Sequence, residues 1–424
     1  MENPKIRFKG FTKDWEQRKL GEVLISLQNN TLSRADLSNE TGIAKNVHYG
    51  DVLIKFGDVL NVSREQLPMI KDEMILDKYK ASFLQNGDVI IADTAEDTTV
   101  GKCSEIAGLR DEVVLSGLHT IPYRPVEKFA TGYLGYYLNS DAYHDQLIPL
   151  MQGIKVTSIS KSAMKDTDIV YPKSTEEQAM IGSYFQSLDH LITLHQRKCE
   201  QTKKLKKYML QKMFPQNGAK VPEIRFDGFT YDWEQRKLGD LVNRITRKNQ
   251  DLVSELPLTI SAQYGLIDQN EFFDKRVASK DVSSYYLIEN GEFAYNKSTS
   301  TDAPWGAIKR LDRYENGVLS TLYIVFGIKE NNLVDSDFLV SYYSTNLWHK
   351  GIHEIAAEGA RNHGLLNIAP ANFFETELMI PQDIEEQKKI GKYFEELDHL
   401  ITLHQRKCDE LKKMKKYMLQ NMFI

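Results

Sequence analysis

The sequence predicts an α+β protein in which two globular domains are joined by two long antiparallel coiled-coil helices, with a pseudo-two-fold internal duplication. Three observations lead to this prediction. A short block near the start of the chain recurs identically, a second block ending in a cysteine also recurs, and apolar residues around the second block follow coiled-coil spacing. The segments between the blocks differ, so the chain reads as one frame carrying two unlike domains.

The two recurring blocks define the repeat unit. Asp-Trp-Glu-Gln-Arg-Lys-Leu-Gly occupies residues 14–21 and again 232–239, an offset of 218. Leu-Asp-His-Leu-Ile-Thr-Leu-His-Gln-Arg-Lys-Cys occupies residues 188–199 and again 397–408, an offset of 209. The stretch between the blocks is therefore nine residues shorter in the second copy. Each copy consists of an arm, a variable domain and a long helix.

The repeats divide the chain into six segments. The variable domains have about 140–150 residues, the size of a single core. The boundaries are an arm at 1–21, a first variable domain at 22–172, a central helix at 173–215, a linker with the second arm at 216–239, a second variable domain at 240–381 and a last helix at 382–424. Within the domains, apolar patterning predicts strands at 51–56, 88–92, 120–123 and 322–327, and helices at 132–138 and 338–346.

A three-four spacing of apolar residues predicts each long helix and its coiled-coil seam. At about 40 residues, each helix would be roughly 60 Å long. Antiparallel pairing would let each helix bury the seam of the other, and parallel pairing remains the alternative. Carboxylates at the start and lysines at the end of each helix suit the helix dipole, so the lysines are interpreted as solvated helix ends. The expected seam residues are Ile181, Leu188, Leu191 and Leu205, then Ile390, Leu397, Ile401 and Leu411.

Composition narrows the class of protein. The chain has 424 residues, 41% hydrophobic and 27% charged, which is typical of a globular protein. Its three cysteines lack zinc-type spacing, which favours reduced thiols and no metal. A charged amino terminus and the lack of any run of about 18 apolar residues predict a cytoplasmic protein without membrane association. The net charge of −5 gives no overall attraction to a polyanion, although a local basic face would suffice.

No catalytic motif is found, and we assign no catalytic or metal-binding residue. The chain has no Walker-type glycine loop, no Asn-Pro-Pro-Tyr, no glycine-rich turn for an adenosyl cofactor and no His-Glu-x-x-His. Carboxylates within 93–97 could in principle hold Mg²⁺ for phosphodiester cleavage. Asp93 is the sixth residue after Gly87, however, and the sixth after the equivalent Gly291 is Lys297. A duplicated nuclease site would keep its carboxylates in both copies, so a specificity loop is the preferred interpretation.

The polar loops of the variable domains are the candidates for DNA contact. Each base pair presents its own pattern of donors and acceptors in the major groove, so loops of different chemistry would read different bases. An ordinary solvated loop is the alternative for any single residue. The candidates are Lys55, Asp93, Thr94, Thr98, Lys102, Lys155, Thr157 and Ser158 in the first copy, and Arg244, Lys297, Ser298, Thr299, Ser300, Arg361, Asn362 and His363 in the second. Trp15 and Trp233 are expected to anchor the arms by packing rather than to stack on bases.

These blocks resemble the specificity subunit of type I restriction-modification systems. The likeness rests on the arm block, on Pro172 and Pro381 leading to Glu-Glu-Gln, on the Leu-Asp-x-x-Ile helix, and on the closing Leu-Lys-Lys-x-x-Leu-Gln-x-Met-Phe at 205–214, repeated at 414–423 with Met leading. It spans the whole chain in the family's order. The resemblance implies that the variable regions are target recognition domains, each reading one half of a split, asymmetric DNA sequence, while the helices set the spacer.

The resemblance also implies partners. Two modification subunits would dock on the chain, carry S-adenosylmethionine and methylate adenine. Restriction subunits that hydrolyse ATP and cleave DNA would complete the assembly, so S-adenosylmethionine, ATP and Mg are expected on partner subunits and no cofactor on this chain. The alternative hypothesis is a coiled-coil scaffold that presents two protein-binding domains without direct DNA readout. A stand-alone nuclease is a third and weaker hypothesis.

Overall fold

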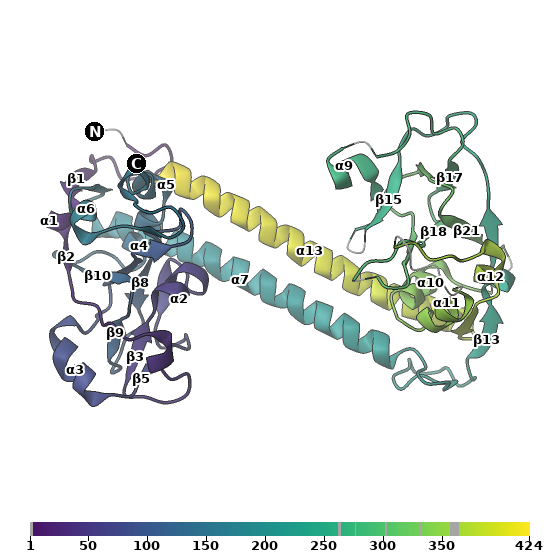
Figure 1. The fold of residues 1–424 in the computed structure, drawn as a ribbon, viewed down its shortest axis with the longest axis horizontal. Helices are drawn as coiled ribbons and strands as arrows, with labels where there is room; N and C mark the ends of the chain where they lie inside the picture. The colour runs from purple at the N-terminus through teal and green to yellow at the C-terminus, as the bar shows by residue number, and fades with distance from the viewer. Residues whose placement is uncertain (1–2, 262–263, 276, 302, 331–332, 357–363) are drawn as a thin grey trace. The chain divides into compact units, whose positions relative to one another are not determined.

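The structure is a computed structural model that describes residues 3–261, 264–275, 277–301, 303–330, 333–356 and 364–424. The chain forms two compact units. Unit 1 comprises residues 1–196 and 405–424, and unit 2 comprises residues 197–404. The helices α7 (Thr175–Lys212) and α13 (Ile384–Met422) run unbroken in Figure 1, and each contributes one part to each unit.

The main sheet of unit 1 has five strands. The middle strands β6 and β8 are buried along their whole length, because the sheet is covered on both faces. Neighbouring strands are antiparallel except β4 and β8, which are parallel. The order is β2 (Leu24–Ser26), β10 (Thr120–Pro125), β6 (Val89–Ala92), β8 (Cys103–Ala107) and β4 (Val59–Asn61). A smaller sheet has the order β5 (Met69–Ile70), β3 (Ala44–Val47) and β9 (Val114–Ser116).

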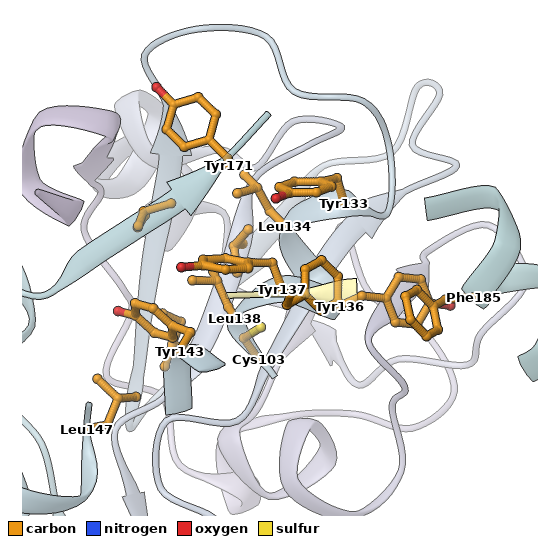
Figure 2. Packing of buried hydrophobic residues seen from close by; sticks show 14 of the residues in the cluster. Cys103, Tyr133, Leu134, Tyr136, Tyr137, Leu138, Tyr143, Leu147, Tyr171 and Phe185 are labelled. Atoms are coloured by element: carbon orange, nitrogen blue, oxygen red, sulfur yellow. The ribbon is translucent and has the colours of Figure 1, made fainter. Parts of the chain in front are cut away.

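Helix α4 (Tyr133–Leu138) forms the centre of the unit 1 core, and all six of its residues are buried. Figure 2 shows its tyrosines gathered beside Cys103 and Phe185. Gly135 is required because a Cβ there would lie 2.1 Å from the Asp58 carbonyl oxygen. Phe423, from the end of the chain, stacks on Phe185 and packs edge-on against Tyr133. The core of unit 1 therefore includes the C-terminal part of α13.

Unit 2 repeats this plan with different side chains. Phe214, at the end of α7, packs against Trp233, Phe338 and Phe394 just as Phe423 packs in unit 1. The main sheet has the order β14 (Val242–Ile245), β21 (Ile324–Ile328), β18 (Phe293–Asn296) and β19 (Ala307–Arg310). Two further pairs are β15 (Leu258–Ser261) with β16 (Gly265–Asp268), and β17 (Tyr286–Glu289) with β20 (Asn316–Leu319).

The remaining elements are short. In unit 1 they are α1 (Leu20–Val23), η1 (Arg34–Asp36), α2 (Tyr49–Ile54), α3 (Glu73–Tyr79), η2 (Lys80–Ser82), α5 (Asp141–His144), η3 (Ile148–Leu150) and α6 (Lys161–Lys165). In unit 2 they are α8 (Leu238–Leu241), α9 (Gln269–Phe273), α10 (Ser336–Tyr343), α11 (His349–Ile355) and α12 (Pro370–Phe374). None of the helices in the described part of the chain combines the length and apolarity needed to cross a membrane.

Most of the predicted local elements are present, but the strand predicted at 51–56 is wrong. That segment belongs to α2, which begins where the His48 ring nitrogen accepts a hydrogen bond from the Gly50 amide at 3.2 Å. Val52 is buried while Ile54 is 88% exposed. The apolar run is too short to distinguish a helix capped in this way from a strand.

Each duplicated arm is fixed to its long helix by a buried carboxylate. In unit 1 the arm strand β1 (Glu16–Lys19) pairs with β12 (Asp168–Tyr171). Arg7 donates two hydrogen bonds to Glu177, at 2.6 and 2.9 Å, and the Trp15 indole lies 3.4 Å from the same carboxylate. Trp15 is buried, which confirms that it anchors the arm by packing.

Unit 2 has the same arrangement. Strand β13 (Glu234–Lys237) pairs with β22 (Glu377–Ile380). Arg225 donates to Glu386 at 2.7 and 2.8 Å, and the Trp233 indole lies 3.3 Å away. The sequence pattern indicates only that these glutamates suit the helix dipole. In the structure each is the buried partner of an arginine and a tryptophan from the arm.

The seam of the long helices follows alternate spacings of four and three residues, but its phase differs from part of the prediction. Leu191 and Leu205 are wrong as seam residues, since they are 39% and 45% exposed. Their neighbours Ile192 and Lys206 occupy the seam. A search based on apolar residues does not detect a lysine at a seam position. The seam positions, all buried or half-buried, are 181, 185, 188, 192, 195, 199, 202, 206 and 209 in α7, and 390, 394, 397, 401, 404, 408, 411, 415 and 418 in α13.

Ion pairs at the seam show that the two helices are antiparallel, as predicted. In unit 1, Lys415 Nζ lies 2.6 Å from Asp189 Oδ1. In unit 2, Lys206 Nζ lies 2.6 Å from Asp398 Oδ1. The step along α7 between these pairs (206 − 189) equals the step backwards along α13 (415 − 398), which is 17 residues in both cases. The chain therefore places equivalent residues of the two copies at equivalent positions of one antiparallel pair.

Removal of the buried carboxylate in unit 1 tests the arm attachment. The substitution Glu177→Ala leaves Arg7 without its partner, and breaking such a pair lowers the free energy of unfolding by about 3 kcal/mol. Urea unfolding monitored by tryptophan fluorescence measures the loss. The control is Glu176→Ala, an exposed carboxylate in the same turn, which removes at most about 0.5 kcal/mol of dipole interaction. Equal stability of the two variants would contradict the assignment.

Candidate nucleic-acid interface

The two candidate loops of the first variable domain are joined by backbone pairing. Strand β7 (Thr94–Ala95) pairs antiparallel with β11 (Thr157–Ser158), so Ser158 lies opposite Thr94. The Asp93 amide donates to the His119 carbonyl at 3.1 Å, and the Ile159 amide donates to the Asp93 carbonyl at 2.9 Å. We call the three segments that meet here, residues 93–95, 119 and 157–159, corner 1. They lie where β6 ends and β10 begins.

The second variable domain joins its loops in the same way. Ser298 forms an isolated bridge with Leu365, and the Thr299 amide donates to the Gly364 carbonyl at 2.7 Å. Lys297 follows β18, and Tyr323 precedes β21. We call residues 297–299, 323 and 364–366 corner 2. The candidates Arg361, Asn362 and His363 lie outside the described residues.

Polar side chains in corner 1 contact one another. The Thr94 hydroxyl donates to Asp93 Oδ1 at 2.8 Å, and His119 Nδ1 lies 3.4 Å from the same oxygen. The Tyr49 ring is nearly perpendicular to the imidazole, with 5.3 Å between ring centroids and an interplanar angle of 77°. His119 was not among the predicted residues. The sequence does contain a signal for it. His119 is the third residue after Ser116, and Tyr323 is the third residue after the equivalent Ser320, so aligning the two copies places His119 and Tyr323 at the same position.

Lys155 lies on a rigid hairpin beside corner 1. Gln152 and Ser158 exchange both backbone hydrogen bonds, at 2.9 and 2.8 Å. Gly153 has a φ of +115°, and a Cβ there would lie 2.0 Å from the Val156 carbonyl oxygen, so only glycine fits. Residues 154–156 are exposed at the tip. Lys155 is thereby placed at the exposed tip of a hydrogen-bonded hairpin.

Three other candidates of the first copy do not join corner 1. Lys102 Nζ donates to the Leu53 carbonyl at 2.6 Å, and burial lowers the pKa of this lysine. Lys55 Nζ donates to the Gln66 carbonyl. Thr98 lines a polar cleft with Lys102 that also includes Asp58, Asn139, Asp141 and His144. The structure thus gives the two lysines backbone partners within the domain.

The second-copy candidates divide similarly. Lys297 is half-buried, and burial lowers its pKa. The Ser298 amide donates to the Asn296 side chain at 3.0 Å, and the Thr299 hydroxyl to the Gly364 carbonyl at 3.2 Å. Ser300 closes a turn with Ala303. Arg244 is exposed on the edge strand β14, away from the pairing that builds corner 2.

The carboxylates of 93–97 do not converge. Asp97 accepts hydrogen bonds from the Thr99 hydroxyl at 2.5 Å and from its amide at 2.9 Å, and these bonds hold the pKa of Asp97 below its usual value. Asp93 contacts Thr94 and His119 instead. Within the described ranges, no group of three or more His, Cys, Asp or Glu side chains is arranged to hold a metal ion.

Comparison with known proteins identifies the family. The model described as type I restriction modification DNA specificity domain matches residues 12–204 and 231–413. The chain belongs to this family. One match falls on each copy of the duplication. This specificity subunit is a non-catalytic component of a type I restriction-modification enzyme.

Individual relatives agree with this assignment. A protein of Methanocaldococcus jannaschii described as the type I restriction enzyme MjaX specificity subunit is 23% identical over 436 residues, covering 96% of this chain and 92% of the relative. The crystal structure of the type I restriction-modification S subunit from M. genitalium has a TM-score of 0.62 at 13% identity, covering 100% of this chain and 99% of the other. At that identity, the structural likeness shows the fold alone.

Proposed function

We propose that each variable domain of this specificity subunit reads one half of a bipartite, asymmetric DNA target. The observation that carries this proposal is the pair of corners. Both are built by the same backbone pairing, yet corner 1 presents Asp93 and His119 where corner 2 presents Lys297 and Tyr323. Corner 1 therefore offers hydrogen-bond acceptors, which suit the amino group of cytosine or adenine, whereas the lysine of corner 2 donates to guanine O6 or N7. Equivalent positions with different chemistry suit two different half-sites.

The paired helices are proposed to set the number of unread base pairs between the half-sites. Both helices are continuous, and two seam ion pairs fix their register. A continuous helix of 38 residues spans about 57 Å. No break interrupts either helix, so the length of each helix follows from its number of residues.

The same helices carry a surface suited to docking two modification subunits. Nine exposed large apolar residues on α7 and α13 each immediately precede a seam residue, and in an antiparallel pair such positions lie on the same side of both helices. Met180 lies near the start of α7, and the other eight lie farther along the pair. These eight form one patch of four in each unit. The unit 1 patch is Leu191, Leu194, Met414 and Tyr417, and the unit 2 patch is Leu205, Tyr208, Leu400 and Leu403.

The two patches are related by the duplication, since each position of one corresponds to a position of the other at an offset of 209, with the same residue in three pairs and Leu205 matched by Met414 in the fourth. Two equivalent surfaces fit two copies of one partner. We therefore propose that each patch takes one modification subunit. These subunits would supply S-adenosylmethionine and adenine methylation, and restriction subunits would supply ATP hydrolysis and Mg-dependent cleavage. With a net charge of −5 on this chain, much of the phosphate contact would also come from partners.

Exchange of one variable domain tests the division of readout. Replacing residues 22–171 by the corresponding domain of another specificity subunit should change one block of the methylated sequence and leave the other block unaltered. The reciprocal exchange of residues 240–381 is the matched control and should change the other block. Single-molecule sequencing of methylated adenines measures both. Simultaneous change of both blocks by one exchange would contradict independent readout.

Equal lengthening of both helices tests the spacer. Lys206 on α7 lies opposite Asp398 on α13. Because the helices are antiparallel, Arg197, nine residues earlier on α7, lies opposite Lys407, nine residues later on α13. Seven residues inserted between Arg197 and Lys198, and seven between Arg406 and Lys407, therefore keep the seam in register. The helices gain about 10 Å, equivalent to about 3 bp of DNA. The two blocks should stay the same while the spacer lengthens, and an unchanged spacer would rule out this role.

Charges placed in the apolar patches test docking. Leu191→Asp should reduce the number of bound modification subunits from two to one, and adding the equivalent Leu400→Asp should reduce it to none, because a buried unpaired carboxylate opposes association. Light scattering after size-exclusion chromatography measures the mass of the complex. The control, Thr193→Asp with Thr402→Asp, lies on the other side of the helices and should leave two subunits bound. Full binding by the double leucine variant would refute the assignment.

A further inference from the structure

His119 has an unusual backbone conformation. Its φ is +55°, in the left-handed region where residues other than glycine are uncommon, although histidine, asparagine and aspartate occur there more often than other side chains. The residue lies immediately before β10, and the next residue, Thr120, is fully buried. Glycine would adopt this conformation without strain. An observed backbone outlier of this kind points to a purpose for the side chain.

The imidazole of His119 is not part of a hydrophobic core. Its side chain is 48% exposed, and its described contacts are the Asp93 carboxylate and the Tyr49 ring. The equivalent residue of the second domain, Tyr323, has a different role. There Asn296 Nδ2 donates a hydrogen bond of 3.4 Å to the phenol, and the Thr259 hydroxyl lies 3.5 Å from it. The position therefore belongs to the corner in both domains, while its side chain differs in exposure and chemistry.

The Asp93 carboxylate lies beside one ring nitrogen of His119, with 3.4 Å between Asp93 Oδ1 and Nδ1. A carboxylate next to Nδ1 favours the form in which Nδ1 carries the proton, and the other ring nitrogen is then an acceptor. Asp93 is itself fixed by the Thr94 hydroxyl and by two backbone hydrogen bonds, to the His119 carbonyl and from the Ile159 amide. Among the residues that the structure describes, none forms a hydrogen bond with His119 Nε2. With the proton on Nδ1, Nε2 is an acceptor for which the described residues supply no donor.

We propose that His119 is a specificity-determining residue of the first half-site and that Asp93 is its positioning residue. His119 Nε2 accepts a hydrogen bond from the exocyclic amino group of adenine or cytosine in the major groove. Guanine and thymine present O6 and O4, which are acceptors and cannot pair with this nitrogen. The inference rests on the proposed reading of DNA by the variable domains, and it adds the chemical class of base that corner 1 selects.

The test uses the full chain assembled with its modification subunits. The methylated sequence is first mapped for the wild-type complex. Methylation rates are then measured on duplexes in which each position of the first half-site carries each of the four bases, for His119→Gly, His119→Asn and Asp93→Asn. Met74→Ala, an exposed residue on α3, is the control. Melting temperatures are recorded for every variant.

His119→Gly should lose about tenfold of the discrimination between amino and keto bases at one position, the worth of one hydrogen bond. The second half-site should be unaffected, and the melting temperature should not fall because the strain is relieved. His119→Asn should show the same loss, since asparagine tolerates the backbone but is too short to replace the ring. Asp93→Asn keeps the ring but no longer fixes its tautomer, so discrimination at that same position should weaken.

Three results would overturn the inference. One is wild-type base preference in His119→Gly. Another is a lowered melting temperature in both His119 variants, because the imidazole would then serve the fold. The third is an Asp93→Asn effect at a different position from that of His119. Absence of a two-block motif in the wild-type complex would instead refute the proposed function, so the two failures are distinguishable.

Discussion

The antiparallel pairing of α7 and α13 is the constraint on which the other features of the chain depend. The described residues include a lysine–aspartate pair across the seam in both units, Lys415 with Asp189 in unit 1 and Lys206 with Asp398 in unit 2. Although burial alone would lower the pKa of Lys415, the nearby Asp58 and Asp189 raise it above its ordinary value, so the charge is retained. A charged group in a seam is satisfied only when its partner is level with it. Such pairs therefore specify register more than they add stability.

The helices also complete the domains. Phe423 belongs to the core of unit 1 and Phe214 to the core of unit 2, while Glu177 and Glu386 hold the two arms. Each domain is thus built partly from the end of a helix that starts in the other copy. Substitutions in the recurring parts are limited, because these parts complete the cores of both domains. The loops of the corners are not limited in this way. This separates a fixed frame from variable side chains, as sequence recognition requires.

Much of this organisation is predictable from the amino-acid sequence because duplication exposes it. The identical blocks define the frame, and the contrast of Asp93 with Lys297 argues against a duplicated nuclease site. The seam phase is missed at Leu191 and Leu205, because a lysine stands at seam position 206 and apolar periodicity cannot detect it. His119 is missed because a histidine in the sequence does not reveal that its backbone will adopt a positive φ. The joining of residues 93–95 to 157–159 depends on backbone pairing over some 60 residues of chain, which local patterns do not reveal.

The central claim is that one chain carries two independent half-site readers. It is tested most directly by expressing the wild-type chain with its modification subunit in cells that lack other adenine methyltransferases, and mapping every methylated adenine in the genome. Two independent readers on one frame should yield a single motif with two defined blocks separated by a fixed number of unspecified bases. A stable complex that methylates no defined sequence, or one contiguous block, would contradict the claim.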